Sequence, residues 1–249
     1  LERALLQIVS NYHFDNFLML IKSAGFITPG MVNSKNALNF AYALYLRLRE
    51  DKEMTEGERK RIVKRWFVMS MLTGRHSGSF ESTWEQDIRR IGEQGAANYL
   101  KQIEESELSD AYWAVTLPAA LETTSTVSPF FQTFLAAQVT TNARGFLSKG
   151  ITVAAMHQQS GDIHHIVPKD YLQKNGYPDR GDYNQVANFA LTETSINISI
   201  SNKPTMDEGD FRIRRIMVPL VEAHLPVAMN AECSQEFERR LFRANLNLE

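Results

Sequence analysis

Apolar residues recur at helical spacing through most of residues 1–150, and this pattern constrains the fold more than any other feature of the chain. Residues three and four positions apart lie on one face of a helix, so the repeated apolar stripe predicts helices that pack together. Ser34 is a candidate N-cap for a helix ending near Arg49, and Thr55 with Glu58 has the spacing of a capping box. We therefore expect a helical domain over residues 1–150.

Short polar segments divide this region into further helices. Gly25 and the group 28–30 interrupt one apolar stretch, and a Gly/Ser-rich loop over 73–79 interrupts another. Ser82 is a candidate N-cap for the helix after that loop. We expect helices over residues 82–91 and near 94–105, 109–121 and 128–141.

The pattern changes near Gly150. Residues 162–167 form a short run rich in β-branched side chains, and residues 186–192 form a second such run. Pro168 suits the first turn of a short helix, because its missing N–H needs no partner there. Two strands joined by a short helix and a polar loop are therefore expected.

A further helix is expected directly after the second strand. Thr194 or Ser195 is positioned to cap it, and it would carry Asn197. The predicted fold class is mainly α, with a small strand–loop–strand–helix motif within residues 151–209. C-terminal helices over residues 210–249 are expected to pack on the rest.

Composition and charge limit the function classes. The chain has 249 residues, 43% of them hydrophobic, which is enough to bury a sizeable core. The net charge of −2 gives no global positive field, which counts mildly against a nucleic-acid partner, although a local basic face would suffice. Cys233 is the single cysteine, which excludes an internal disulfide and a cysteine-based zinc site. No signal peptide or membrane-spanning run is recognisable, so a cytoplasmic protein is expected.

The strongest chemical signal is a histidine pair followed by two apolar residues and a proline. His164 and His165 precede Ile-Val-Pro, Asn188 lies in the second predicted strand, and Asn197 follows nine residues later. This order resembles the HNH, or ββα-metal, nuclease motif over about residues 160–205. The run that begins at Asn197 is similar to the segment that closes the motif in the C-terminal nuclease region of GmrSD-type, modification-dependent restriction endonucleases.

The resemblance implies a role for each residue of the pair. His165 is the implied general base, and histidine titrates close enough to neutral pH to serve as one. His164 and Asn197 are the implied metal ligands. Asp162 precedes His164 by two residues and so shares its face of the strand. It is a further ligand, a partner that orients an imidazole, or simply a cap of the strand end.

Two further residues complete the implied catalytic set. Asn188 is expected to brace the loop between the strands, and Lys203 is a candidate contact to the scissile phosphate. The implied cofactor is a divalent metal. Mg²⁺ keeps several waters, so few protein ligands suffice. The imidazole of His164 stands where many relatives have Asp or Glu, and it also suits Mn²⁺, Ni²⁺ or Zn²⁺.

Basic residues in the helical region are candidate DNA contacts. Arg61, Lys64 and Arg65 lie near the start of one predicted helix, where positive charge opposes the helix dipole, and Arg75 lies in the loop that follows. A phosphate backbone would explain this charge. A solvated helix start and a plain loop are the simpler interpretations.

The function implied by the resemblance is metal-dependent cleavage of DNA, within a restriction or anti-phage defence protein that acts on modified DNA. The alternative is a catalytically inactive HNH-like module that binds DNA or a protein. The sequence starts at Leu1 inside a helical pattern, so an N-terminal regulatory or recognition domain is expected upstream. A homodimer is expected if both DNA strands are cut.

Overall fold

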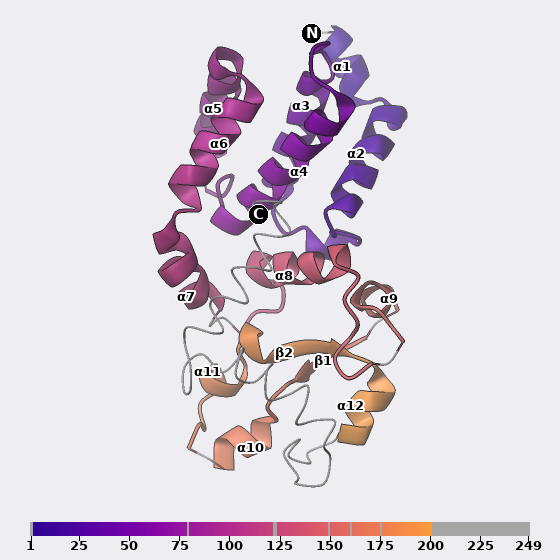
Figure 1. Ribbon diagram of the computed structural model, residues 1–249, viewed down its shortest axis with the longest axis vertical. Helices are drawn as coiled ribbons and strands as arrows, with labels where there is room; N and C mark the ends of the chain where they lie inside the picture. The colour runs from indigo at the N-terminus through magenta and orange to yellow at the C-terminus, as the bar shows by residue number, and fades with distance from the viewer. Residues whose placement is uncertain are drawn as a thin grey trace.

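The computed structural model describes residues 2–78, 80–121, 124–148, 150–159, 161–174 and 176–200. These residues form a mainly helical protein with one two-stranded antiparallel sheet (Figure 1). The predicted mainly α class is therefore confirmed for this part of the chain. The helices predicted over 210–249 lie outside the described residues.

The first part of the chain is a series of helices joined by short turns. Ser34 caps its helix as predicted, accepting a hydrogen bond from a first-turn amide at 3.2 Å. Thr55 and Glu58 form the predicted capping box. Ser82 is not a cap, because its helix begins two residues earlier. The elements are α1 (Glu2–Ile8), α2 (Asn11–Ser23), the 3-10 turn η1 (Pro29–Met31), α3 (Lys35–Leu48), α4 (Glu56–Thr73), α5 (Phe80–Gln94) and α6 (Ala96–Glu107).

Helix α4 is the centre of this bundle. Most of its residues from Ile62 to Leu72 are buried, and Trp66 and Phe67 have no exposed surface. A helix that is apolar around most of its circumference needs neighbours on several sides. Helices α2, α3, α6 and α8 (Pro129–Thr140) pack against it.

The helix predicted over 109–121 is interrupted by a π turn. This turn, η2 (Tyr112–Thr116), leads directly into α7 (Leu117–Leu121). Pro118 stands at the second position of α7 and has no N–H to donate to the preceding turn. Widening the helix into a π turn accommodates such a missing bond.

Helix α8 connects the helical bundle to the sheet. Its Phe131 ring lies 6.1 Å from the ring of Phe189 in the second strand. One hydrophobic core extends from Phe17 in α2 to Leu191 in β2 (Phe189–Thr192) of the sheet. At the end of α2, a Cβ on Gly25 would lie 2.1 Å from a carbonyl oxygen of α8, so this close approach requires glycine. The hairpin thus rests on the same core as the helices.

The remaining described elements surround the sheet, as Figure 1 shows below α8. The predicted helices after Pro168 and around Asn197 are both present, whereas the predicted second strand begins with a 3-10 turn. No helix in the described ranges has both the length and the apolar character needed to cross a membrane. The elements are α9 (Val153–Gln158), β1 (Asp162–His165), α10 (Lys169–Lys174), α11 (Arg180–Tyr183), η3 (Val186–Asn188), β2 (Phe189–Thr192) and α12 (Thr194–Ile200).

Candidate active site

The β1–β2 hairpin positions the histidine pair. Its antiparallel register places His164 opposite Ala190 and His165 opposite Phe189. Successive strand residues point to opposite faces, so the two imidazoles leave β1 on opposite sides. His164 is buried, whereas His165 is partly exposed.

The three predicted metal ligands lie together on one face of the hairpin. His164 Nδ1 is 2.6 Å from Asn197 Oδ1, and Asn197 Nδ2 donates to Asp162 Oδ2 at 3.4 Å. An amide oxygen only accepts, so Nδ1 of His164 carries the hydrogen in this arrangement. Helix α12 follows β2 directly and contacts β1, which brings Asn197 back to the strand that carries the other two residues.

Burial keeps His164 in its neutral form. The residue is 7% exposed, and its ring stacks on Phe146 with 6.1 Å between ring centroids. Desolvation lowers the pKa of His164, the hydrogen bond to Asn197 opposes this shift, and the charge of His165 adds to it. Its Nε2 is buried and makes no hydrogen bond within the described structure. A neutral imidazole is the form that binds a metal ion.

His165 is held by a residue that sequence reasoning did not identify. Its Nε2 is 2.8 Å from Asn184 Oδ1, at the end of α11. Because that oxygen accepts, the hydrogen is on Nε2 and the neutral ring keeps a lone pair on Nδ1. The His165 ring also packs edge-on against Phe189 at 5.2 Å between centroids. These contacts fix both the tautomer and the orientation of the ring.

Asn188 braces the connection between the strands, as predicted. Its Oδ1 accepts from the Val167 amide at 2.7 Å, and its Nδ2 donates to the carbonyls of Val167 at 3.0 Å and Tyr183 at 2.8 Å. The Asn188 backbone carbonyl accepts from the Ile166 amide at 2.8 Å. Both polar atoms of the Asn188 side chain are bonded to the loop backbone, so Asn188 stabilises the conformation of the loop that follows the histidine pair.

The donor set suits a divalent cation that needs few protein ligands. The His164 imidazole, the Asn197 amide and the Asp162 carboxylate form a chain of hydrogen bonds here, with Asn197 Oδ1 facing His164 and Asn197 Nδ2 facing Asp162. His164 Nδ1 and Asn197 Oδ1 lie 2.6 Å apart, so a cation held by both atoms would replace the hydrogen between them, and the imidazole hydrogen would then be on Nε2. Among the described residues, no three His, Cys, Asp or Glu side chains are grouped so that they could hold a metal ion together. The set therefore fits a cation that keeps several waters better than a closed tetrahedral zinc site.

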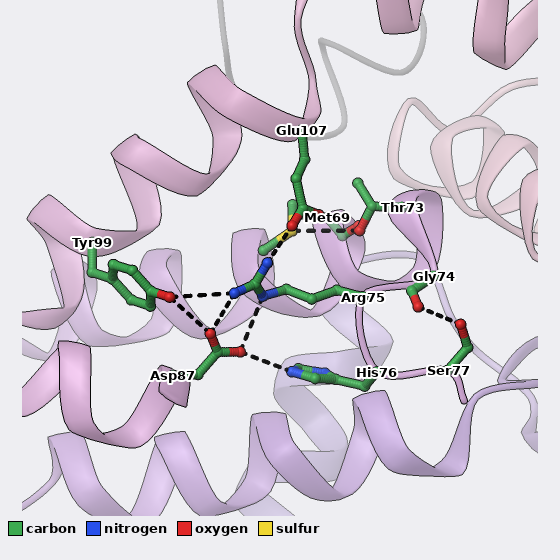
Figure 2. Close-up of polar contacts among 9 residues, drawn as sticks. All are labelled: Met69, Thr73, Gly74, Arg75, His76, Ser77, Asp87, Tyr99 and Glu107. Atoms are coloured by element: carbon green, nitrogen blue, oxygen red, sulfur yellow. Dashed lines mark hydrogen bonds and ion pairs between the residues drawn. The ribbon is translucent and has the colours of Figure 1, made fainter. Parts of the chain in front are cut away.

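Two of the four predicted DNA contacts have acidic partners inside the helical bundle. Arg65 Nε donates to Glu104 Oε1 at 2.9 Å. Arg75 donates from Nε to Asp87 at 3.0 Å and also pairs with Glu107 (Figure 2). The Arg75 side chain is only 10% exposed. The charges of Arg65 and Arg75 are thus used within the fold, and the prediction that they contact DNA loses its basis.

The basic start of α4 has a structural use for one residue. Arg59 Nε donates to the carbonyl of Leu48 at 2.8 Å, and its Nη2 donates to that of Met54 at 3.3 Å. The Leu48 carbonyl lies in the last turn of α3, where helices leave acceptors unpaired and positive charge is favourable, whereas the Met54 carbonyl lies just before the N-cap of α4. Arg61 is exposed and Lys64 half-buried, so these two remain the candidate DNA contacts on α4.

A lysine of the motif also lies near the candidate base. Lys169 Nζ is 5.1 Å from the centroid of the Tyr183 ring, which is itself 6.5 Å from that of His165. Lys169 is exposed. Lys169 becomes a candidate site residue only through its position in the fold, because a lysine directly after a proline does not by itself predict a role in a site. The predicted phosphate contact Lys203 lies outside the described residues.

Comparisons with known proteins give no match: no family model, no curated protein and no solved structure matches the chain. The donor types and distances around the hairpin therefore indicate what the site is able to bind.

Proposed function

We propose that this chain is a metal-dependent nuclease that hydrolyses phosphodiester bonds of DNA at the β1–β2 hairpin. The observation that carries the proposal is the meeting of His164, Asn197 and Asp162 on one side of β1, with His165, the next residue of the strand, oriented by Asn184. These residues come from β1 and α12, and sequence spacing alone does not bring them together.

His165 acts as the general base. Its Nε2–H is donated to Asn184, so the Nδ1 lone pair takes a proton from water while the water oxygen attacks phosphorus. The bond from phosphorus to the leaving sugar oxygen breaks, and that oxygen takes a proton from solvent. His164 is less suited to this role, because it is buried and bonded to Asn197. Asn184 is a positioning residue that keeps the required tautomer.

A divalent cation bound at this site would place positive charge on the phosphate oxygens. His164, Asn197 and Asp162 would hold it, and Mg²⁺ is the cation we propose, with Mn²⁺, Ni²⁺ and Zn²⁺ as alternatives that imidazole tolerates. Lys169 is exposed over the ring of Tyr183, which also lies near His165, and contributes further positive charge to this part of the surface.

DNA is the proposed substrate on two grounds. The motif resembles the nuclease region of GmrSD-type enzymes, which supports a role in restriction and action on modified DNA. Arg61, Lys64 and Lys169 provide local positive charge in a chain without net positive charge. An inactive binding module would not need a base held in one tautomer, so the contact between His165 and Asn184 favours the enzyme over that alternative.

Plasmid cleavage tests the proposal. Supercoiled DNA, unmodified and carrying modified cytosine, is incubated with the chain and each of the four metals, with a chelator as control. Metal-dependent nicking supports the proposal. Linear products would show that both strands are cut, which indicates two active sites acting together, as in a homodimer. DNA binding without cleavage under every condition would instead support the inactive module. Absence of both binding and cleavage would contradict the proposed substrate.

A further inference from the structure

A cleft lies in the helical bundle where the start of α3, the end of α4 and the following loop meet. Its volume is about 410 Å³, and Lys35, Asn36, Ser70 and His76 are among its lining residues. Ligand pockets for small molecules begin at roughly this size. No step of the proposed nuclease reaction uses these residues.

Two buried polar atoms in this cleft have no hydrogen-bond partner within the described structure. They are Ser70 Oγ and His76 Nδ1, and each residue is 1% exposed. An unsatisfied buried polar atom costs about 1–3 kcal/mol, so such atoms are rare unless they meet a ligand or a water. Two of them lining one cleft indicate a polar group that belongs there.

The orientation of His76 is fixed from behind. Its Nε2 is 3.1 Å from Asp87 Oδ2, and its ring lies 4.5 Å from that of Phe40. Figure 2 shows Asp87 between His76 and Arg75, whose guanidinium balances the carboxylate charge. Nδ1 is therefore the ring nitrogen of His76 that lacks a hydrogen-bond partner within the described structure, and the charge of Asp87 on the other side of the ring is compensated by Arg75.

The charge around the cleft favours an anion. Its lining contains Lys35 and no Asp or Glu. Helix α3, 14 residues long, starts at Lys35 with no acidic residue in its first turn. The first amides of a helix lack internal acceptors and carry partial positive charge, which suits phosphate.

We propose that this cleft binds the phosphate group of a small molecule. Lys35 and the first turn of α3 contact the phosphate from one side, and Ser70 donates its hydroxyl from the other. His76 donates its Nε2 hydrogen to Asp87, so its Nδ1 lone pair accepts a hydrogen bond from a hydroxyl oxygen of the monoprotonated phosphate group. Met71 and Pro129 also line the cleft and provide apolar surface for an organic part. This proposal is independent of the nuclease function.

Thermal unfolding in phosphate, compared with chloride at equal ionic strength, tests the proposal. A ligand that binds only the folded state raises Tm progressively with concentration. Lys35→Gln should reduce this rise. Because Lys35 is exposed, the substitution should have little effect on the stability of the unliganded protein. Lys22→Gln, at an exposed lysine of α2, is the matched charge control and should leave the rise intact.

Ser70→Ala gives the sharper result. Its hydroxyl has no partner, so removing it should leave the unliganded Tm unchanged or slightly higher while the phosphate-dependent rise shrinks. An equal rise in all variants would show a general salt effect and overturn the proposal, as would no rise in the wild type. A lower unliganded Tm in Ser70→Ala would also overturn it, because the hydroxyl would then be satisfied within the fold.

NMR spectroscopy tests whether His76 contacts the phosphate. In ¹⁵N-histidine-labelled protein, the signals lost in His76→Gln identify His76, and phosphate should shift its Nδ1 resonance more than that of His13. Glycerol phosphate, tested beside inorganic phosphate, distinguishes the sources: tighter binding of the ester indicates an organic phosphate, and equal binding indicates the free anion. No shift at His76 with either compound would contradict the site.

Discussion

The Nδ1 atom of His164 lies 2.6 Å from the side-chain oxygen of Asn197, a residue 33 positions away in the sequence. This contact joins the first strand to the helix after the second strand. It brings together a histidine and an asparagine that are far apart in the sequence, so that both could contribute to one metal site. The adjacent His165 leaves the strand on the other side and is held by Asn184.

The contact between Asn184 and His165 predicts a loss of rate without a loss of fold. Asn184→Ala removes the acceptor that keeps the hydrogen on Nε2, and we expect cleavage to fall about 10- to 100-fold. Asn184→Asp keeps an acceptor and should retain more activity than the alanine variant. The measurement is initial cleavage rate against pH, since a lost tautomer preference alters the profile. Equal rates in all three proteins would show that Asn184 does not position the base.

Asn188 should matter mainly for stability. Asn188→Ala removes three side-chain hydrogen bonds and leaves the Val167 amide and carbonyl without these partners. We expect a loss of about 2–4 kcal/mol in the free energy of unfolding. Asn98→Ala is the control, because Asn98 makes one exposed bond to Gln94 and should cost less than about 0.5 kcal/mol. Similar urea midpoints for both variants would contradict the bracing role.

Arg61 and Lys64 carry the remaining prediction for DNA contact in the helical bundle. Replacing each by Gln should reduce the slope of log binding constant against log salt by about 0.9 if each contacts one phosphate of duplex DNA. Lys22→Gln, on α2, should leave the slope unchanged. Unchanged slopes for Arg61→Gln and Lys64→Gln would show that this part of α4 is simply solvated.

His157 makes part of the stability depend on pH. Its Nε2 lies 3.0 Å from the Thr28 hydroxyl, and burial lowers the pKa of His157 in the folded state. The unfolded chain, with a pKa near 6.5, therefore binds more protons as pH falls below that value. The stabilising contribution is complete above about pH 6.5 and declines as pH falls toward the folded-state pKa. Urea unfolding near pH 7.5 and 5.5 should show a smaller decline in His157→Gln than in the wild type, and equal declines would contradict this assignment.

The helical class and the strand–helix motif were predictable because both depend on local pattern. The capping box of Thr55 and Glu58 and the strand at 162–165 follow from neighbouring residues. The π turn before Pro118 was not predicted. It depends on how one missing N–H is accommodated inside a helix, and spacing does not show this.

Within the site, residue types were predictable and partners were not. His164, Asn197 and Asp162 were expected on one cluster because the motif orders them. Asn184 was missed, since its role depends on where α11 places it relative to His165. Arg75 was predicted to be a free cation in a loop. The sequence does not show that Asp87, in the following helix α5, lies against it and binds its guanidinium.

The most direct test is cleavage by His165→Ala and His164→Ala across a range of metal concentrations, with circular dichroism as the folding control. His165→Ala should stay folded and lose about 10²- to 10⁴-fold in cleavage rate at every metal concentration. His164→Ala should recover part of its activity at high metal, because a lost ligand acts through affinity. Cleavage by His165→Ala at the wild-type rate would contradict the central claim.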